Sequence, residues 1–349
     1  MVIWMQKSQN VVEVYSGVYQ IRLPIPIRSL GSVFVYLVHE GDHNLLIDTG
    51  WNTDECYAAL KSGLKSVGVA IPQLEKIIVS HLHPDHYGLS TRLKKEAPDY
   101  TLIMHRSDAL AIRDTEAKFK LFIQKMNDWA RDEGVPADEV RAMMQSSMPV
   151  LEFVAPAMPD IQVIGGEVIR VGDQKEFVVI STPGHTVGNI CLYERNGSGL
   201  FFSGDHILPT VTPNVSLSPL YTGDPLGDYL ESLEKLRKYK VSKILPSHEF
   251  IFTDLGKRID EIEAHHKERL DDTLKALEGA REGISGYTVA SRMHWHVGPW
   301  EKLSPWEKRA ALMETLAHLE YLKRKGKVAE IQEATGDERR ILYSAISSC

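Results

Sequence analysis

The residues best suited to chemistry lie in Ile77–Leu89, IIVSHLHPDHYGL. Its apolar start, Ile77–Val79, predicts a buried strand. Four side chains of the ligand type follow on the next loop, namely His81, His83, Asp85 and His86. Imidazole and carboxylate bind zinc and its neighbours, and loops at strand ends often hold such ligands. Alternation along an extended loop lets the first two side chains face one ion and the last two a second. An accidental cluster on a polar surface loop is the alternative, and this density argues against it.

Further ligand-type residues follow other apolar, strand-like runs. They are Asp48, His185, Asp205 and His248. Loops at the same edge of a sheet lie close in space, so we expect these scattered side chains to meet the first cluster at one site. Without Asp48, the set holds five histidines and two aspartates, enough for two ions that share a carboxylate.

The ordered motifs resemble the metallo-β-lactamase superfamily. They are H-x-H-x-D-H, a histidine after a T-P-G turn, a G-D pair and a late histidine. Within that superfamily the chain looks like the hydrolases related to glyoxalase II, lactonases and thioesterases. The resemblance covers about residues 11–254. It implies the α/β fold class, as a four-layer αββα sandwich with metals at one edge between the sheets. The antibiotic-destroying branch lacks the bridging aspartate pattern and carries a signal peptide, so a β-lactamase is not expected.

The resemblance also implies a role for each ligand-type residue. His81, His83 and His185 would bind the first metal ion, and Asp85, His86 and His248 the second. Asp205 would bridge the two ions, and Asp48 would lie behind the ligands, orienting one of them and fixing its tautomer. Two divalent ions are the implied cofactors. Zinc is the default for this set, while iron and manganese accept the same ligands.

Two such ions suit hydrolysis. At about 3.5–4 Å apart they can hold a hydroxide near neutral pH, because coordination lowers the pKa of water towards about 7. That bridging hydroxide attacks a carbonyl or phosphorus atom. Asp85 is the candidate for passing a proton to the leaving group, and Asp205 for positioning the nucleophile. Tyr87 and Tyr221 could hydrogen-bond a substrate carbonyl, although tyrosines near clefts more often pack.

The favoured function is a dinuclear metal-dependent hydrolase of a thioester, lactone or related ester, with a small acyl substrate. Lactonases of the family place a tyrosine soon after the bridging aspartate. Here that segment reads His206-Ile207-Leu208-Pro209, which favours a thioesterase. One alternative is a phosphodiesterase or endoribonuclease, since some relatives with a winged-helix-like tail cut RNA. The other is a non-catalytic metal-binding sensor, against which both aspartates argue.

Composition restricts the partners and the compartment. The chain of 349 residues has a net charge of −7 and a pI near 6.1, which argues against non-specific nucleic-acid binding. Three widely spaced cysteines suggest no disulfide framework and fit a reducing cytosol. The N-terminal segment lacks a signal-peptide core, and no apolar run of about 18 residues is present. We therefore expect a cytoplasmic protein without membrane contact.

The predicted elements give two regions. Residues 1–254 form the catalytic domain, with strands predicted near each ligand and a helical insertion at 107–150. The insertion is either a lid over the substrate cleft or a structural decoration, and the sequence does not decide between them. Residues 255–349 form a helical domain. Ser304–Glu307 is a capping box, Gly326 ends its helix, and the VAEIQ strand resembles the wing of a winged helix.

This C-terminal domain could contact a protein, form a homodimer or cover the cleft, each of which fits an acidic chain better than DNA binding. Other histidines are expected to carry less chemistry. His206 should point away from the ions, His105 could lie near the site or on the surface, and His265-His266 and His294-Trp295-His296 should belong to helix packing.

Overall fold

A computed structural model describes residues 10–26, 31–112, 115–152, 157–217, 223–335 and 338–346. Its first sheet has seven strands side by side in chain order, antiparallel from β1 to β4 and parallel from β4 to β7. The strands are β1 (Val11–Tyr15), β2 (Val18–Pro24), β3 (Ser32–Glu40), β4 (His43–Ile47), β5 (Lys76–Ile78), β6 (Thr101–His105) and β7 (Ile161–Val163).

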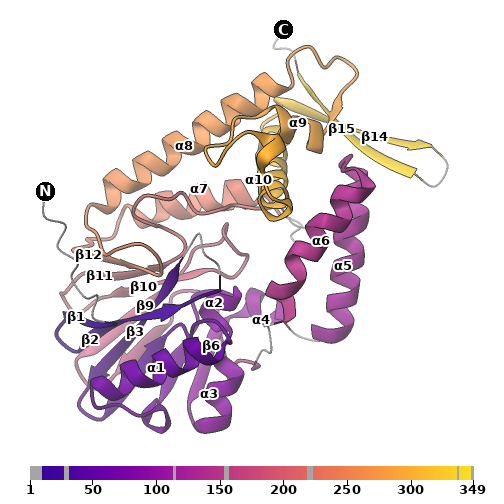
Figure 1. The fold of residues 1–349 in the computed structure, drawn as a ribbon. Coiled ribbons are helices and arrows are strands. Elements are labelled where there is room, and N and C mark those ends of the chain that lie inside the picture. Colours follow the sequence, from indigo (N-terminus) through magenta and orange to yellow (C-terminus); the bar gives the residue numbers. More distant parts are fainter. Residues whose placement is uncertain are drawn as a thin grey trace, which may run out of the picture.

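The second sheet has five strands in the order β12-β11-β10-β9-β8. Only β11 and β12 pair in parallel; the other neighbours are antiparallel. The strands are β8 (Val168–Val171), β9 (Lys175–Ser181), β10 (Ile190–Glu194), β11 (Leu200–Gly204) and β12 (Lys243–Pro246). The two sheets pack face to face, as Figure 1 shows.

Helices cover both outer faces and complete four layers (Figure 1). Beside the first sheet lie α1 (Asp54–Ser66) and α3 (Ser90–Glu96), and beside the second lie α7 (Pro225–Leu236) and α8 (Leu255–Ala276). Both faces of the first sheet are apolar and must be covered, as β3 shows. Its alternate residues Val35 and Leu37 pack in the helix-facing core, whereas Tyr36 and Val38 pack between the sheets. The predicted αββα sandwich is confirmed.

In its described residues, the insertion has three helices, α4 (Arg106–Ile112), α5 (Thr115–Asp132) and α6 (Ala137–Glu152). Its core is shared with the C-terminal region, because Ala130, Val140 and Met143 pack in one cluster with Leu316 and Tyr343. In Figure 1, α5 and α6 lie beside the C-terminal helices. The insertion is thus tied to the C-terminal region and does not stand alone.

The C-terminal region contains a helix pair and a small sheet. Its elements are β13 (Ile284–Ser285), α9 (Gly286–Arg292), α10 (Pro305–Arg324), β14 (Val328–Thr335) and β15 (Glu338–Ala345). The predicted capping box at Ser304 is present, and the β14–β15 hairpin follows α10 where a wing was expected. The sequence analysis did not predict β7, β13 or β15. None of the described helices is long and apolar enough to cross a membrane.

One helix joins the two regions. The first half of α8 packs on the second sheet through Ile259 and Ile262, whereas its end, at Ala276 and Leu277, packs in the C-terminal core. The domain boundary after residue 254 stays a prediction. The remaining elements are the short helix α2 (Pro84–Tyr87) and the 3-10 turns Ile71–Gln73 and Trp300–Lys302.

Candidate metal centre

Five strands of the two sheets end near one another, and each is followed by a ligand-type residue. Asp48 follows β4, the His81–His86 loop follows β5, and His185 lies on the loop after β9. Asp205 and His248 follow β11 and β12. The seven predicted ligands form two groups, each with its donor atoms within 4.8 Å of one another. The groups are His81, His83, His185 and Asp205, and Asp85, His86 and His248.

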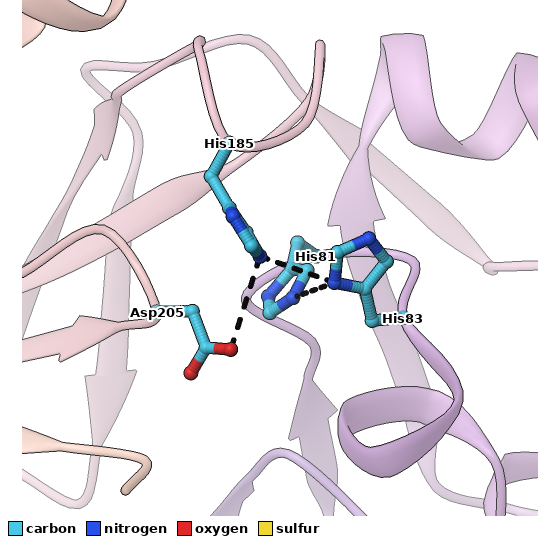
Figure 2. A group of neighbouring side chains, drawn as sticks. All are labelled: His81, His83, His185 and Asp205. Atoms are coloured by element: carbon cyan, nitrogen blue, oxygen red, sulfur yellow. Dashed lines mark hydrogen bonds and ion pairs between the residues drawn. The ribbon is translucent and has the colours of Figure 1, made fainter. Parts of the chain in front are cut away.

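The first group brings three imidazoles to one point (Figure 2). His83 Nδ1 lies 3.0 Å from His81 Nε2 and 3.1 Å from His185 Nε2. Asp205 Oδ2 lies 3.8 Å from His185 Nε2. His81 is buried, while His83 and His185 are half-buried, so this group has an accessible side. Three ring nitrogens that face one another in this way offer a cation three lone pairs.

The second group lies on the other side of Asp205. His248 Nε2 is 3.3 Å from Asp85 Oδ2, and His86 Nε2 is 3.6 Å from the same oxygen. Asp205 places Oδ2 at 3.4 Å from His86 Nε2 and Oδ1 at 3.5 Å from His248 Nε2. With one oxygen also towards His185, the Asp205 carboxylate stands between the two groups.

The donor set fits divalent cations. His86 Nε2, His248 Nε2 and Asp205 Oδ1 are buried and have no hydrogen-bond partner. A buried polar atom without a partner costs about 1–3 kcal/mol, so three at one place point to a missing partner. Imidazole nitrogens with shared carboxylates suit zinc, iron and manganese. The cluster is therefore able to bind metal ions, and the arrangement is consistent with a dinuclear site.

The two groups differ in electrostatics. Burial lowers the pKa of His83 to about 3, helped by the nearby His185, so its ring is neutral and its lone pair is free for a metal. Burial also opposes the charge on His248, but Asp205 and Asp85 outweigh it and raise the pKa of His248 to about 10. Burial also opposes the charge on Asp205, but the nearby His248 and His86 outweigh it and hold the pKa of Asp205 well below the usual value. Asp85 and Asp205 are thus ionised beside protonated histidines, and their two carboxylates are the charges that would attract a cation in place of those protons.

Asp48 contacts the ligand loop from behind. Its Oδ2 accepts from His86 Nδ1 at 2.9 Å, which leaves Nε2 facing the centre. Its carboxylate also accepts from Ser80 N at 2.7 Å and from Ser80 Oγ at 2.9 Å. Asp48 has a left-handed backbone with φ 63°, a conformation that aspartate tolerates better than most residues. This geometry is the one expected of a residue that fixes a ligand tautomer.

Asp108 is a supporting residue that the sequence analysis missed. It is buried in α4 and accepts from Leu82 N at 2.8 Å, from Thr186 Oγ1 at 3.0 Å and from Gly188 N at 2.7 Å. One carboxylate therefore ties the His81–His86 loop to the loop that carries His185. An acidic residue in a helical segment gives no signal of this role, because its partners are two backbone N–H groups and a hydroxyl on distant loops.

A second support holds His185 itself. Its Nδ1 lies 2.8 Å from the carbonyl oxygen of Asn214, in the segment Leu208–Leu217, here called the strap. Arg258 is buried in α8 and donates to three carbonyl oxygens of the strap, those of Leu208, Thr210 and Val211. Glu249 accepts from Thr210 N and Val211 N on the other side. Two charged side chains thus fix the strap that orients a ligand.

The other described candidates do not belong to the two ligand groups. Tyr87 is fully buried in the helix-facing core and donates to the carbonyl oxygen of Ala157, so it has no surface left for a substrate. We therefore withdraw its expected substrate contact. Tyr221 lies outside the described residues. His206 packs against Tyr229, and His105 is buried beside Ser181.

Of the later histidines, His266 and His318 take part in helix packing, whereas His294 and His296 are exposed on a loop and only Trp295 between them packs. His266 and His318 are buried and adjacent, with Nδ1 and Nε2 3.2 Å apart. Between His294 and His296, Trp295 packs under Arg269 and against the C-terminal core. In the described part of the chain, the groups of three or more residues able to hold a metal are the two described above.

The sandwich and the ligands at its edge define the class. A family model described as the metallo-beta-lactamase superfamily matches residues 28–248, and the chain belongs to this superfamily. The resemblance inferred from the motifs is thereby confirmed. A solved structure, the metallo-beta-lactamase family protein TTHA1429 from Thermus thermophilus, is 27% identical with a TM-score of 0.79, over 96% of this chain and 100% of that one.

Three curated relatives carry functional names. The probable metallo-hydrolase YqjP of Bacillus subtilis strain 168 is 28% identical over 87% of this chain and 92% of its own. The acyl-coenzyme A thioesterase MBLAC2 of Gallus gallus is 25% identical, over 61% and 71%. A hydroxyacylglutathione hydrolase of Methylobacillus flagellatus is 26% identical, over 70% and 72%. The superfamily and these relatives make this chain a metal-dependent hydrolase.

Proposed function

We propose that the chain hydrolyses the carbonyl–sulfur bond of an acyl thioester, or the corresponding bond of a lactone or related ester, at a dinuclear metal centre. One observation carries this proposal: two ligand groups share the carboxylate of Asp205, and buried donor atoms there lack partners. The names of two relatives, a thioesterase and a hydroxyacylglutathione hydrolase, support a thioester.

The side chains of the centre have separate roles in binding metal, orienting the ligands and transferring a proton. His81, His83 and His185 would hold one ion and Asp85, His86 and His248 the other, with Asp205 between them. Bound divalent ions lower the pKa of coordinated water towards about 7 and polarise a carbonyl oxygen. Asp48 and Asn214 fix the rings of His86 and His185 from behind. Asp85 Oδ2, 3.3 Å from His248 Nε2, is the atom we assign to carrying a proton to the leaving group.

The test combines metal analysis with a substrate panel. Purified protein supplied with zinc, manganese or iron is assayed for its metal content and for hydrolysis of an acyl thioester, a lactone, a simple ester and a phosphodiester. We expect two ions per chain, turnover of the thioester or lactone, and loss of turnover with a chelator. The proposed substrate class is wrong if the metal-loaded protein cleaves only the phosphodiester or none of these substrates.

A variant of the shared carboxylate gives the control. Asp205→Asn should lose at least about 100-fold in activity together with part of its metal, because an amide replaces the charge between the two groups. Asp42→Asn, at an exposed turn, should behave as wild type. A non-catalytic sensor would show no activity for Asp205→Asn to lose.

A further inference from the structure

A glutamate with an unusual backbone conformation directly follows one of the predicted metal ligands. Glu249 comes after His248 and has a left-handed backbone with φ 68°. In the described part of the chain, the other non-glycine residues with positive φ are Asp48 and Asp254, and aspartate tolerates this conformation better than glutamate. Backbone strain of this kind persists where the surroundings hold it, and it is common at functional sites. Glu249 is therefore a strained residue next to the metal centre.

Glu249 lies in a closed turn after β12. The turn begins and ends at Ile244 and Phe252, whose backbone groups exchange two hydrogen bonds of 2.8 and 3.2 Å. Residues 245–251 reverse the chain, and a residue with positive φ is a common part of such a reversal. Glycine meets that need without strain. The turn alone therefore does not require a glutamate, and the side chain is what distinguishes Glu249 from a glycine.

The side chain of Glu249 holds the strap. Its carboxylate accepts from Thr210 N at 2.8 Å, from Val211 N at 3.2 Å and from the Thr210 hydroxyl. All three donors belong to the strap, and the three residues are exposed. Water can satisfy an exposed carboxylate equally well, so its hydration does not require these contacts. Three hydrogen bonds to one short segment indicate instead that the carboxylate fixes the position of the strap.

The strap connects this contact to a ligand of the other group. The carbonyl oxygen of Asn214 lies 2.8 Å from His185 Nδ1, and His185 Nε2 faces the first group. Val211 and Asn214 are separated by at most about 11 Å of extended chain. Glu249 therefore links the turn that carries His248, a member of the second group, to the orientation of His185 in the first group.

We propose that Glu249 is a positioning residue that couples the two metal sites. With an ion on His248 the turn is fixed, and Glu249 then holds the strap in place for His185. Binding at one group thus orders a segment that the other group needs, and by reciprocity each ion strengthens the binding of the other. Arg258 holds the same strap but belongs to α8, which carries none of the predicted ligands. This inference rests on the dinuclear centre of the proposed function.

Titration of the metal-free, full-length protein with zinc tests the coupling without turnover. Calorimetry gives the affinities of the two ions in the wild type, and His81→Ala, which disables the first group, gives the affinity of the second group alone. We expect Glu249→Ala to weaken zinc binding at the first group by about 10-fold. In the His81→Ala background, the same substitution should change zinc binding by less than about 2-fold. Glu55→Ala, at an exposed glutamate of α1, should match the wild type.

Two variants separate backbone strain from positioning. Glu249→Gly and Glu249→Ala both remove the carboxylate, but only glycine adopts a positive φ without strain. Glu249→Gly should therefore melt at a higher temperature than Glu249→Ala, whereas both should lose zinc binding at the first group to the same extent. A loss of zinc binding that follows the melting temperature indicates a structural role and would overturn the proposal. Wild-type zinc binding in Glu249→Ala, or an equal loss at both groups, contradicts it as well.

The two proposals fail in different ways. If Glu249→Ala loses zinc at the first group but the wild type hydrolyses no thioester, lactone or ester, the proposed function fails and the positioning role stands. If the wild type hydrolyses these substrates and Glu249→Ala binds both ions normally, the function stands and the role of Glu249 fails. A wild type that binds a single zinc ion excludes the coupling, whatever its activity.

Discussion

At the scale of single residues, the metal centre depends on carboxylates that lie behind the ligands. Asp48 and Asp108 both accept two or more hydrogen bonds from the ligand loops. Supporting partners of this kind usually account for about 10–100-fold in metal affinity or activity. Asp48 holds one imidazole ring, whereas Asp108 holds two loops together. Asp108 therefore has the wider effect on the positions of the metal ligands.

We expect Asp108→Asn to weaken metal binding by about 10–100-fold and to lower stability by about 1–3 kcal/mol. The carboxylate accepts on both oxygens, from Leu82 N and from Gly188 N, and an amide must turn its NH2 towards one of these donors. Metal titration and thermal unfolding measure the two effects. Asp42→Asn is the matched surface control, and an Asp108→Asn protein with normal metal affinity would contradict the assigned role.

The sequence indicates the ligands but not their supports, for a physical reason. Each ligand follows a strand whose apolar run is visible in the sequence, so its place at the sheet edge can be inferred. Asp108, Ser80 and Arg258 act on backbone groups or on side chains of other loops, as Ser80 does on Asp48. Nothing in their local pattern marks this role, because it depends on which loops the fold brings together.

At the scale of elements, the strap is the least regular part of the centre and is held by charge. Arg258 serves three of its carbonyl oxygens, and His185 depends on a fourth, that of Asn214. The strap then reaches α10 through Leu217. The orientation of one ligand is thereby linked to α8 and α10, which lie outside the predicted catalytic domain.

Arg258→Lys should reduce metal occupancy at the first ligand group by about 10-fold and lower stability by about 1–3 kcal/mol. A lysine has a single ammonium and cannot reach all three carbonyl oxygens in the geometry of the guanidinium fork. Competition with a chelator and thermal unfolding measure these changes. Lys267→Ala, exposed on the same helix, is the control. Unchanged occupancy in Arg258→Lys would mean that the strap does not depend on this contact.

The helices and strands themselves were easier to predict than the elements against which they pack. Alternating strands and capped helices are local signals, and most of the predicted strands and the α10 capping box are present. The strands β7, β13 and β15 were missed. β7 has three residues, two of them exposed, and so shows little apolar pattern. The helical insertion at 107–150 was predicted, but not that it would pack against the C-terminal region.

At the scale of the whole molecule, buried ionisable groups join the sandwich to the C-terminal region. His266 of α8 faces His318 of α10, and burial lowers the pKa of His318 to about 3. The unfolded histidine titrates near 6.5, so below that pH the unfolded chain binds the proton that the folded chain refuses. The stability from this group is complete above about pH 6.5 and is lost as the pH falls.

His318→Gln should therefore lose about 2 kcal/mol less stability than the wild type between pH 7 and pH 5. Urea unfolding at the two pH values measures this difference. The metal centre titrates in both proteins and cancels in the comparison. Equal pH dependence in His318→Gln and wild type would show that His318 is protonated in the folded protein.

Glu133 should produce the opposite pH dependence. It follows α5, accepts from Tyr343 Oη at 3.0 Å, and packs against Gly286 at the start of α9. Burial raises its pKa to about 8, although the Tyr343 hydrogen bond opposes the shift. The folded chain thus keeps a proton that the unfolded chain releases near pH 4.5, and stability falls as the pH rises from there to about 8.

Glu133→Gln keeps the neutral form at every pH, so it should match the wild type near pH 5 and exceed it by about 2–4 kcal/mol near pH 8. Exposed Glu333→Gln, on the hairpin, is the control. Because Glu133 lies where the insertion meets the C-terminal region, hydrogen exchange should show α5 losing protection first as the wild type is taken to pH 8. A Glu133→Gln protein less stable than wild type at pH 8 would mean that the carboxylate is ionised and paired there. The junction would then depend on charge, and the insertion would be held more firmly at high pH.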